Sequence, residues 1–313
     1  WRDSYIHSNG LFYLYTVVGS DVERYPVSYT AATQFQATNL YGEGTGAFPA
    51  DQSDCKKAWD NAYKIISMCN SLCSSFEATT DFEEYMSTGQ PSELSQIYGE
   101  AIALRATIYF ELLRYYGDVP HSLISGQTAQ GLVPRDLIYD YHIQKLIDVE
   151  PYMYRCGESA NVPNTSMTRT YVQGLIGRMC IYAGGYSTRR TDLGSDFYKD
   201  DSGNLYLFDK LTESSITNSF YGRRTDYKKY YEIAQKYLRA CIQSSGTASL
   251  CTLDPRSSNG SRIYDNPYQY VFQQMGEMIT PNENIYEIPE NRGLYSERPY
   301  AFGRPSDGGG KNN

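Results

Sequence analysis

The stretch Gly99–Pro120, G-E-A-I-A-L-R-A-T-I-Y-F-E-L-L-R-Y-Y-G-D-V-P, decides the fold of this chain. Apolar residues recur every three or four positions, which predicts a long helix that starts after the N-cap residue Ser92. Two apolar stripes lie side by side along it: Leu94, Ile97, Ala101, Leu104, Ile108, Leu112 and Tyr115 in the first, and Ala103, Ala106, Phe110 and Leu113 in the second. A helix that is apolar on more than one side must be covered on more than one side. We therefore predict a central helix enclosed by neighbours.

The end of this helix combines a strong stop with buried charge. Gly117 suits a left-handed C-terminal residue, and Pro120 blocks any continuation. Arg105 and Arg114 lie within the apolar pattern, where an arginine needs a carboxylate or several carbonyl groups as partners. The segment Tyr-Gly-Asp-Val-Pro then reads as a defined turn.

This segment resembles the hallmark helix of the SusD/RagB family, the glycan-capturing outer-membrane lipoproteins of Bacteroidetes. The family pattern reads roughly E-A-x-x-L-R-A-x-x-Y-F-x-L-x-R-x-Y-G-D-V-P. The chain matches this pattern at Glu100, Ala101, Leu104, Arg105, Ala106, Tyr109, Phe110, Leu112, Arg114, Tyr116, Gly117, Asp118, Val119 and Pro120. The helix before it also resembles the family pattern W-x-x-x-Y-x-x-I-x-x-x-N, at Trp59, Tyr63, Ile66 and Asn70.

Periodicity and capping residues predict the other elements. We expect a buried helix over residues 5–18, a helix capped by Asp51 or Ser53 whose apolar seam runs from Trp59 to Phe76, and helices over 135–149, 169–186 and 227–242. Tyr182 is assigned to the buried side of helix 169–186. Gly174 and Gly177 weaken that helix, so close approach of another helix must compensate. We predict an irregular insertion over residues 188–224. Residues 284–289 are predicted to form a short strand and resemble the family's E-x-I-F-E-I segment.

These elements predict a mainly α fold with long irregular loops and few short strands. The resemblance implies a tetratricopeptide-like helical-repeat scaffold, arranged as one domain over residues 1–313. Its parts are helical pairs at about 51–120 and 134–186, the insertion 188–224, a helix at 226–244 and a loop-rich end at 245–313. Family members are normally longer at both ends and start from a lipid-bearing cysteine, so we expect the chain to be a fragment.

Composition limits the partners. The net charge of −8 and the pI near 5 argue against nucleic acid or an anionic membrane surface. No stretch has the roughly 18 apolar residues of a membrane span. Tyrosine is abundant, with 32 copies, and its ring suits both helix packing and stacking on a sugar; we assign only a few tyrosines to a ligand.

Cysteine spacing and acidic runs predict no cofactor. Seven cysteines are an odd number, so they cannot all pair within the chain. Cys69 and Cys73 lie on the apolar side of a predicted helix, where we expect core thiols. Cys241 and Cys251 bracket a short loop that a disulfide could close. Scattered histidines and the lack of C-x-x-C argue against structural zinc. The run 200–204 offers calcium ligands, but its glycine is misplaced for an EF-hand loop, which favours a solvated turn.

The resemblance implies a non-catalytic glycan-binding protein on the outer face of the outer membrane. Its partner would be a SusC-like TonB-dependent transporter, and a missing N-terminal lipid anchor would be its only membrane attachment. The long loop 20–49 has no helical period, and compact domains rarely keep such a loop unless it binds something. By position, the glycan ligands implied by the resemblance are Arg24, Phe35, Asn39, Tyr41, Tyr295, Arg298 and Tyr300.

Two other classes of function stay open at this point. A helical glycoside hydrolase needs two carboxylates about 5–10 Å apart; Glu83, Glu84, Glu287 and Glu290 are available, but nothing in their context directs them into a cleft. The chain has no Walker loop, nucleophile elbow, H-E-x-x-H or dinucleotide fingerprint, so we do not expect an enzyme. A helical-repeat adaptor that binds protein segments is the second alternative.

Overall fold

The computed structural model describes residues 53–127, 131–194, 196–261, 263–277 and 279–288. The chain divides into two compact units, one of which runs from Cys69 to Glu287. The described part of the other unit comprises residues 53–68 and Ile288. The helix predicted over residues 5–18 lies outside the described residues, as do the ends of the predicted single domain, so both stay predictions.

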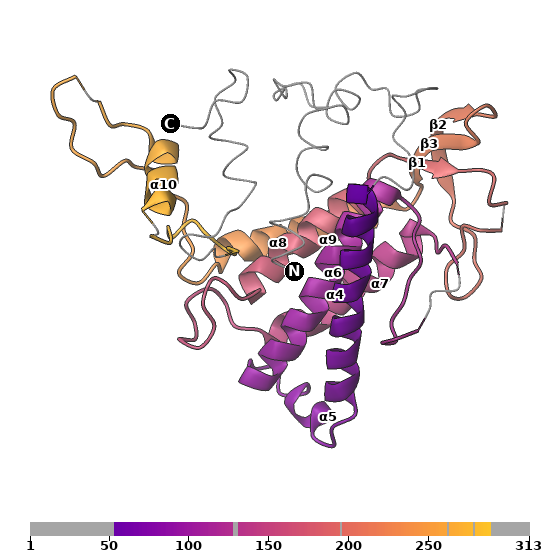
Figure 1. The fold of residues 1–313 in the computed structure, drawn as a ribbon, viewed down its shortest axis with the longest axis horizontal. Helices are drawn as coiled ribbons and strands as arrows, with labels where there is room; N and C mark the ends of the chain where they lie inside the picture. The colour runs from indigo at the N-terminus through magenta and orange to yellow at the C-terminus, as the bar shows by residue number, and fades with distance from the viewer. Residues whose placement is uncertain (1–52, 128–130, 195, 262, 278, 289–313) are drawn as a thin grey trace. The chain divides into compact units, whose positions relative to one another are not determined.

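Helix α4 (Ser53–Glu77) and helix α6 (Glu93–Tyr116) are joined through the short helix α5 (Phe82–Tyr85) (Figure 1). The Tyr98 hydroxyl of α6 donates to Glu77 Oε1 at 2.8 Å, which ties the end of α4 to the start of α6. Cys69 and Cys73 on α4 are buried free thiols, as predicted.

Helix α6 is the buried helix that the sequence predicts. Ser92 and Ser95 cap its first turn reciprocally, and nearly every side chain from Ala101 to Leu113 is buried. The first stripe, however, reaches solvent at its start, because Leu94 and Ile97 are 51% and 46% exposed. The first turn instead faces the segment after α7 with its polar side, where Ser95 Oγ donates to the Tyr152 carbonyl.

The remaining helices of the larger unit follow in predicted order: α7 (Arg135–Val149) with the short 3-10 helix η1 (Glu150–Tyr152), α8 (Arg169–Ala183) and α9 (Tyr227–Gln243). Helix α7 packs against α6 and α8, and α8 and α9 lie side by side along their length. At Gly177 of α8 an added Cβ would lie 2.4 Å from Leu238 Cγ of α9, which confirms the predicted close approach. Gly174 has open space around it.

The predicted irregular insertion is wrong in part, because it holds a three-stranded antiparallel sheet. Strands β1 (Ser187–Arg190), β2 (Phe208–Ser214) and β3 (Ser219–Arg224) pair in the order β1-β3-β2. The rings of Tyr198, Phe208 and Phe220 contact one another in the small core under this sheet. Most of β2 faces solvent, so the sequence lacks the apolar alternation that marks a half-buried strand.

The segment after α9 also differs from expectation. A further helix, α10 (Pro267–Gly276), lies in the predicted loop-rich end. The predicted strand is absent over the described residues 284–288, whose Glu287 N–H instead donates to the Asn164 carbonyl, while the Asn164 amide donates to the Asn284 carbonyl. Cys241 and Cys251 are free thiols rather than a disulfide. The mainly α fold is confirmed.

Candidate ligand-binding site

The hallmark arginine in the middle of α6 is held by an amide rather than a carboxylate. Arg105 is 3% exposed, and its Nη1 donates to Asn70 Oδ1 of α4 at 2.8 Å. The Asn70 amide in turn donates to the Ser122 carbonyl at 3.0 Å, and the Tyr109 hydroxyl donates to the same oxygen. The expectation of a carboxylate or several carbonyls is wrong for Arg105, where one side-chain amide joins α4, α6 and the loop beyond Pro120, and is confirmed for Arg114, which pairs with Glu111.

Two histidines lie close to this arginine. His121 Nε2 and His142 Nε2 are 3.2 Å apart and share a hydrogen bond. Burial, together with the positive charge of Arg105, lowers the pKa of His121 to about 4. The pKa of His142 is lowered well below its usual value by burial and by the charges of His121 and Arg105. Both rings are therefore neutral at neutral pH, and this interior cluster is a structural feature.

The turn that ends α6 positions the start of α7. Asp118 Oδ1 accepts from the backbone N–H of Arg135 at 2.9 Å and from its Nε at 3.3 Å, and Asp118 Oδ2 accepts from the Tyr198 hydroxyl at 3.1 Å. Gly117 has a φ of +78°, and a Cβ there would lie 2.3 Å from Arg135 Nη2. The predicted left-handed conformation is wrong in detail, because ψ is −122°, but this combination of angles still favours glycine, and the arginine end that lies against it would have to shift for a larger residue.

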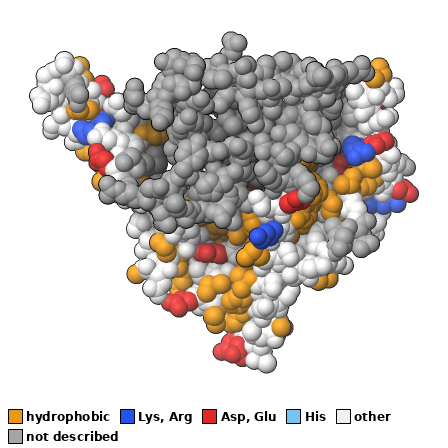
Figure 2. All heavy atoms as spheres, in the orientation of Figure 1, with side chains coloured by type: hydrophobic (Ala, Val, Ile, Leu, Met, Phe, Trp, Pro, Cys, Tyr) orange, Lys and Arg blue, Asp and Glu red, His pale blue; other side chains and the backbone are white. Residues whose placement is uncertain are grey.

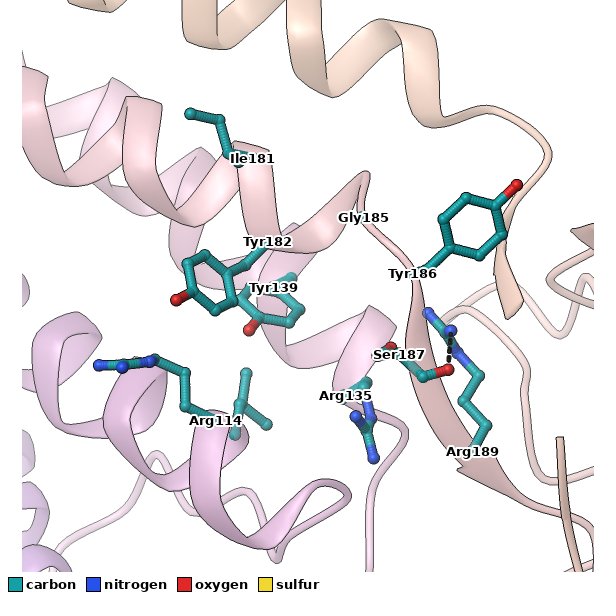
Figure 3. A pocket seen from close by; sticks show the side chains of 10 residues that line it. Arg114, Arg135, Tyr139, Ile181, Tyr182, Gly185, Tyr186, Ser187 and Arg189 are labelled. Atoms are coloured by element: carbon teal, nitrogen blue, oxygen red, sulfur yellow. Dashed lines mark hydrogen bonds between the residues drawn. The ribbon is translucent and has the colours of Figure 1, made fainter. Parts of the chain in front are cut away.

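A pocket of about 330 Å³ opens beside this turn, between the ends of α6 and α8, the start of α7 and strand β1 (Figure 3). Its volume falls in the range of about 300–1,000 Å³ that is typical of small-molecule sites. The residues that line it are Leu113, Arg114, Arg135, Tyr139, Ile181, Tyr182, Gly185, Tyr186, Ser187 and Arg189. The lining combines aromatic rings with arginines, and no carboxylate belongs to it among the described residues.

Tyrosine side chains form much of the pocket wall. Tyr182 is 44% exposed, its ring meets the Phe110 ring in a T-shaped contact, and the Arg114 guanidinium lies over it. Tyr139 is 5% exposed, yet its hydroxyl has no hydrogen-bond partner in the described part of the chain, and burial raises its pKa. In Figure 3 the hydroxyls of both tyrosines point to the side of the pocket where Arg114 lies.

Two of the arginines are fixed by the fold. Arg114 lies over the rings of Phe110 and Tyr182, and its Nη1 donates to both carboxylate oxygens of Glu111 at 3.1 and 3.0 Å. Arg189 is almost fully buried in a bidentate pair with Asp136 of α7. The pocket is therefore built from rigid groups.

The site residues predicted from the sequence all lie outside the described residues: Arg24, Phe35, Asn39, Tyr41, Tyr295, Arg298 and Tyr300. Their role stays a prediction. Of the pocket residues, only Arg114 belonged to the hallmark set. The assignment of Tyr182 to the helix core is wrong, since the ring lies at the pocket mouth; the adjacent Gly184-Gly185 pair, which ends α8, was the available signal.

The described residues contain no cluster of three or more histidine, cysteine or carboxylate side chains that would hold a metal ion. In the run 200–204, both carboxylate oxygens of Asp200 accept hydrogen bonds from the turn itself, from the N–H groups of Ser202 and Asn204 and from the Asn204 amide. Within the described part, none of the helices has the length and apolar character of a membrane span.

Comparisons with known proteins identify the class of this fold. A SusD-like family, described as "Starch-binding associating with outer membrane", matches residues 17–142, which include the hallmark helix. One crystal structure matches with a TM-score of 0.50 at 16% identity, over 81% of this chain and 39% of its own. No curated protein sequence matches the chain.

Two further structures match less closely. One, solved with xylogluco-oligosaccharide, has a TM-score of 0.46 at 15% identity and covers 80% of this chain and 41% of its own. The other is a SusD superfamily protein from Parabacteroides distasonis, with a TM-score of 0.46 at 18% identity, 72% coverage of this chain and 37% of its own. The chain thus spans well under half the length of these structures.

The described part is a helical protein of SusD-like fold. Residues 17–142, about two fifths of the chain, are similar to the SusD-like family.

Proposed function

We propose that this protein is a non-catalytic receptor for oligosaccharides at the outer membrane, and that it passes them to a SusC-like TonB-dependent transporter. The observation that carries the proposal is the SusD-like match over residues 17–142, whose family description is starch binding in association with the outer membrane. Attachment by a lipid anchor and a place on the outer face of that membrane belong to the same proposal.

The pocket beside the hallmark turn supports this function. Saccharide sites combine an aromatic ring, on which the apolar face of a sugar stacks, with planar polar groups that bond its hydroxyls. Tyr182 offers the exposed ring, and Arg114 and Arg135 offer guanidinium groups. We propose that loop residues Tyr41 and Tyr295, with the other residues that the family resemblance implies, contribute to glycan binding as well.

The described carboxylates support binding rather than hydrolysis. Glu83 and Glu84 are exposed on the short helix α5. Glu287 accepts hydrogen bonds from the Thr280 hydroxyl and the Asn284 amide, so both of its carboxylate oxygens are engaged within its own loop. Glu290 lies outside the described residues.

An apolar surface supports the transporter as a partner. Leu72 of α4 is 38% exposed, and Leu94 and Ile97 of α6 are about half exposed. Figure 2 shows hydrophobic side chains gathered toward the end of the molecule where α5 lies in Figure 1. We propose that this helical surface packs on the transporter.

Two measurements test the proposed function. Titration calorimetry with a panel of plant and host oligosaccharides is expected to give saturable heat with at least one of them, weakened in Tyr41→Ala or Tyr295→Ala. Incubation with the parent polysaccharides is expected to release no new reducing ends. Binding to none of the panel would contradict glycan capture, and new reducing ends would contradict the non-catalytic role.

The transporter is tested separately by co-purification from outer membranes. The double variant Leu94→Glu/Ile97→Glu is expected to lose the transporter and keep its affinity for oligosaccharide. Retention of the transporter by this variant would contradict the proposed contact surface.

A further inference from the structure

Hydrogen-bond donors without partners gather in the pocket defined above. The Nε and the backbone N–H of Arg135 donate hydrogen bonds to Asp118. Nη1 of Arg114 donates to Glu111. Within the described residues, Nη1 and Nη2 of Arg135 and Nε and Nη2 of Arg114 have no hydrogen-bond partner. These two side chains are 13% and 22% exposed, so both guanidinium groups are reachable from solvent.

The third arginine of the lining has a different role. Nε and Nη2 of Arg189 donate hydrogen bonds to the Asp136 carboxylate at 3.1 and 2.8 Å, and its Nη1 donates to the Gly222 carbonyl at 2.7 Å. Each of its nitrogens is thus occupied inside the fold. The donors available to a ligand come from Arg114 and Arg135.

A tyrosine hydroxyl adds a further donor. Tyr139 lines the pocket and is 5% exposed, and its hydroxyl has no hydrogen-bond partner in the described part of the chain. The hydroxyl oxygen itself is accessible, so a ligand in the pocket can reach it. This hydroxyl therefore indicates a place for a hydrogen-bond acceptor.

The acceptors in the described lining are side-chain hydroxyls, and no carboxylate is among them. The carboxylates nearest to the arginines, Glu111, Asp118 and Asp136, are themselves buried and bonded, and none of them lines the pocket. The hydroxyls of a neutral sugar both donate and accept, so they match a lining that offers both kinds of group. A carboxylate or a sulfate ester only accepts, and a guanidinium binds such planar or multi-oxygen anions with two parallel hydrogen bonds.

We propose that this pocket binds the anionic group, a carboxylate or a sulfate ester, of an acidic sugar unit. Arg114 and Arg135 bond the anion, the Tyr139 hydroxyl donates to it, and the sugar ring stacks on Tyr182. The inference rests on the proposed function and adds the class of saccharide. It concerns a local arrangement, since the net charge of −8 repels anions at long range.

The test is titration calorimetry of the full chain with two acidic probes, oligogalacturonides for the carboxylate and carrageenan oligosaccharides for the sulfate. Each has a neutral counterpart, carboxyl-reduced or desulfated. We expect one acidic probe to bind about tenfold or more tightly than its neutral counterpart, because the neutral counterpart lacks the charge-assisted hydrogen bonds to the guanidinium groups. The arm that binds identifies the anion.

Matched variants locate the effect. Arg114→Gln is expected to weaken the acidic probe about tenfold, and Tyr139→Phe, which keeps the ring and removes only the hydroxyl, by a smaller factor. Arg178→Gln is the control, because Arg178 also lies over the Phe110 ring, is exposed and does not line the pocket. Circular dichroism melting confirms that each variant is folded.

Two results would overturn the inference. One is binding of the acidic probes no tighter than their neutral counterparts; the other is an equal effect of Arg114→Gln and Arg178→Gln. Tight binding of a neutral oligosaccharide alone would overturn the acidic ligand and leave the glycan-binding function standing. Failure of every acidic and neutral oligosaccharide to bind would overturn both.

Discussion

Asp136 on α7 and Arg189 on β1 form two hydrogen bonds, at 2.8 and 3.1 Å, between side chains that are 0% and 2% exposed. One helical turn further along α7, Asp140 accepts from Nη1 of Arg224 at the end of β3, also at 2.8 Å. Two aspartates on α7, Asp136 and Asp140, thereby attach the inserted sheet through Arg189 and Arg224. Since Ser187 and Arg189 of β1 line the pocket, these pairs also fix one of its walls.

Removal of the buried arginine is expected to destabilise the protein strongly. Arg189→Ala leaves the Asp136 carboxylate buried and unpaired, which costs about 3–5 kcal/mol in comparable cases. The control is Arg190→Ala at the next position, whose pair with Asp192 is exposed to solvent and contributes little to stability. Urea unfolding measures both. Similar midpoints for the two variants would show that the Asp136–Arg189 pair does not hold the sheet.

The hallmark glycine is expected to act through Arg135 as well as through its backbone angle. Gly117→Ala and Gly126→Ala both place a Cβ at positive φ, +78° and +74°, and Gly117 also has a ψ of −122°, outside the left-handed helical region, which adds to its backbone cost. At Gly126 the methyl meets open space, whereas at Gly117 it would lie 2.3 Å from Arg135 Nη2. Gly117→Ala should therefore lower the free energy of unfolding further than Gly126→Ala, as measured in urea. Equal losses would contradict the contact with Arg135.

Two glycines of α8 are expected to respond in opposite directions. Gly174→Ala gains roughly 0.5–1 kcal/mol from helix propensity, because nothing lies within 4 Å of the added methyl. Gly177→Ala inserts its methyl 2.4 Å from Leu238 Cγ, and overpacking of this kind costs about 1–3 kcal/mol, which exceeds the gain. Thermal melting distinguishes the two. An increase in Tm for Gly177→Ala would mean that α8 and α9 pack less closely than described.

The paired histidines are expected to make the fold sensitive to mild acid. Their folded pKa values lie below the unfolded value near 6.5, at about 4 for His121 and lower still for His142. The unfolded chain therefore binds more protons between pH 6.5 and 4, so the stability present above pH 6.5 is lost as the pH falls, by up to about 1.4 kcal/mol per pH unit for each histidine. Urea unfolding at pH 7, 6 and 5 measures this slope.

The double variant His121→Gln/His142→Gln provides the control for this pH dependence. It should be less stable than the parent at pH 7 because the buried cluster is disturbed. Its slope between pH 6.5 and 5 should nevertheless be shallower by the histidine contribution. An unchanged slope would assign the acid sensitivity to other groups.

The helices were predictable from the sequence because their signals are local. Ser92, Gly117 and Pro120 mark the ends of α6, and the spacing of its apolar residues gives its burial. The sheet was missed because β2 is mostly exposed and carries little apolar alternation. Its attachment depends on partners more than 50 positions apart, Asp136 with Arg189, which no local pattern reveals.

The pocket was hidden from sequence analysis for a related reason. Its walls come from the end of α6, the start of α7, the end of α8 and β1, so no single stretch contains it. Tyr182 falls on an apolar helical stripe and reads as a core residue, although α8 ends one residue later, at Ala183, and leaves the ring at the surface. The spacing of a helix gives the direction of a side chain and not the presence of a neighbour to cover it.

The most direct measurement of glycan capture at this pocket is titration calorimetry of Tyr182→Ala against the oligosaccharide that binds the parent chain. Loss of the stacking ring should weaken binding about three- to tenfold, as expected for an aromatic contact of roughly 0.5–1.5 kcal/mol. Tyr268→Ala, which removes a tyrosine that is 77% exposed and lies outside the pocket lining, should bind like the parent. Equal affinities for the two variants, or no binding of any oligosaccharide by the parent chain, would contradict the account.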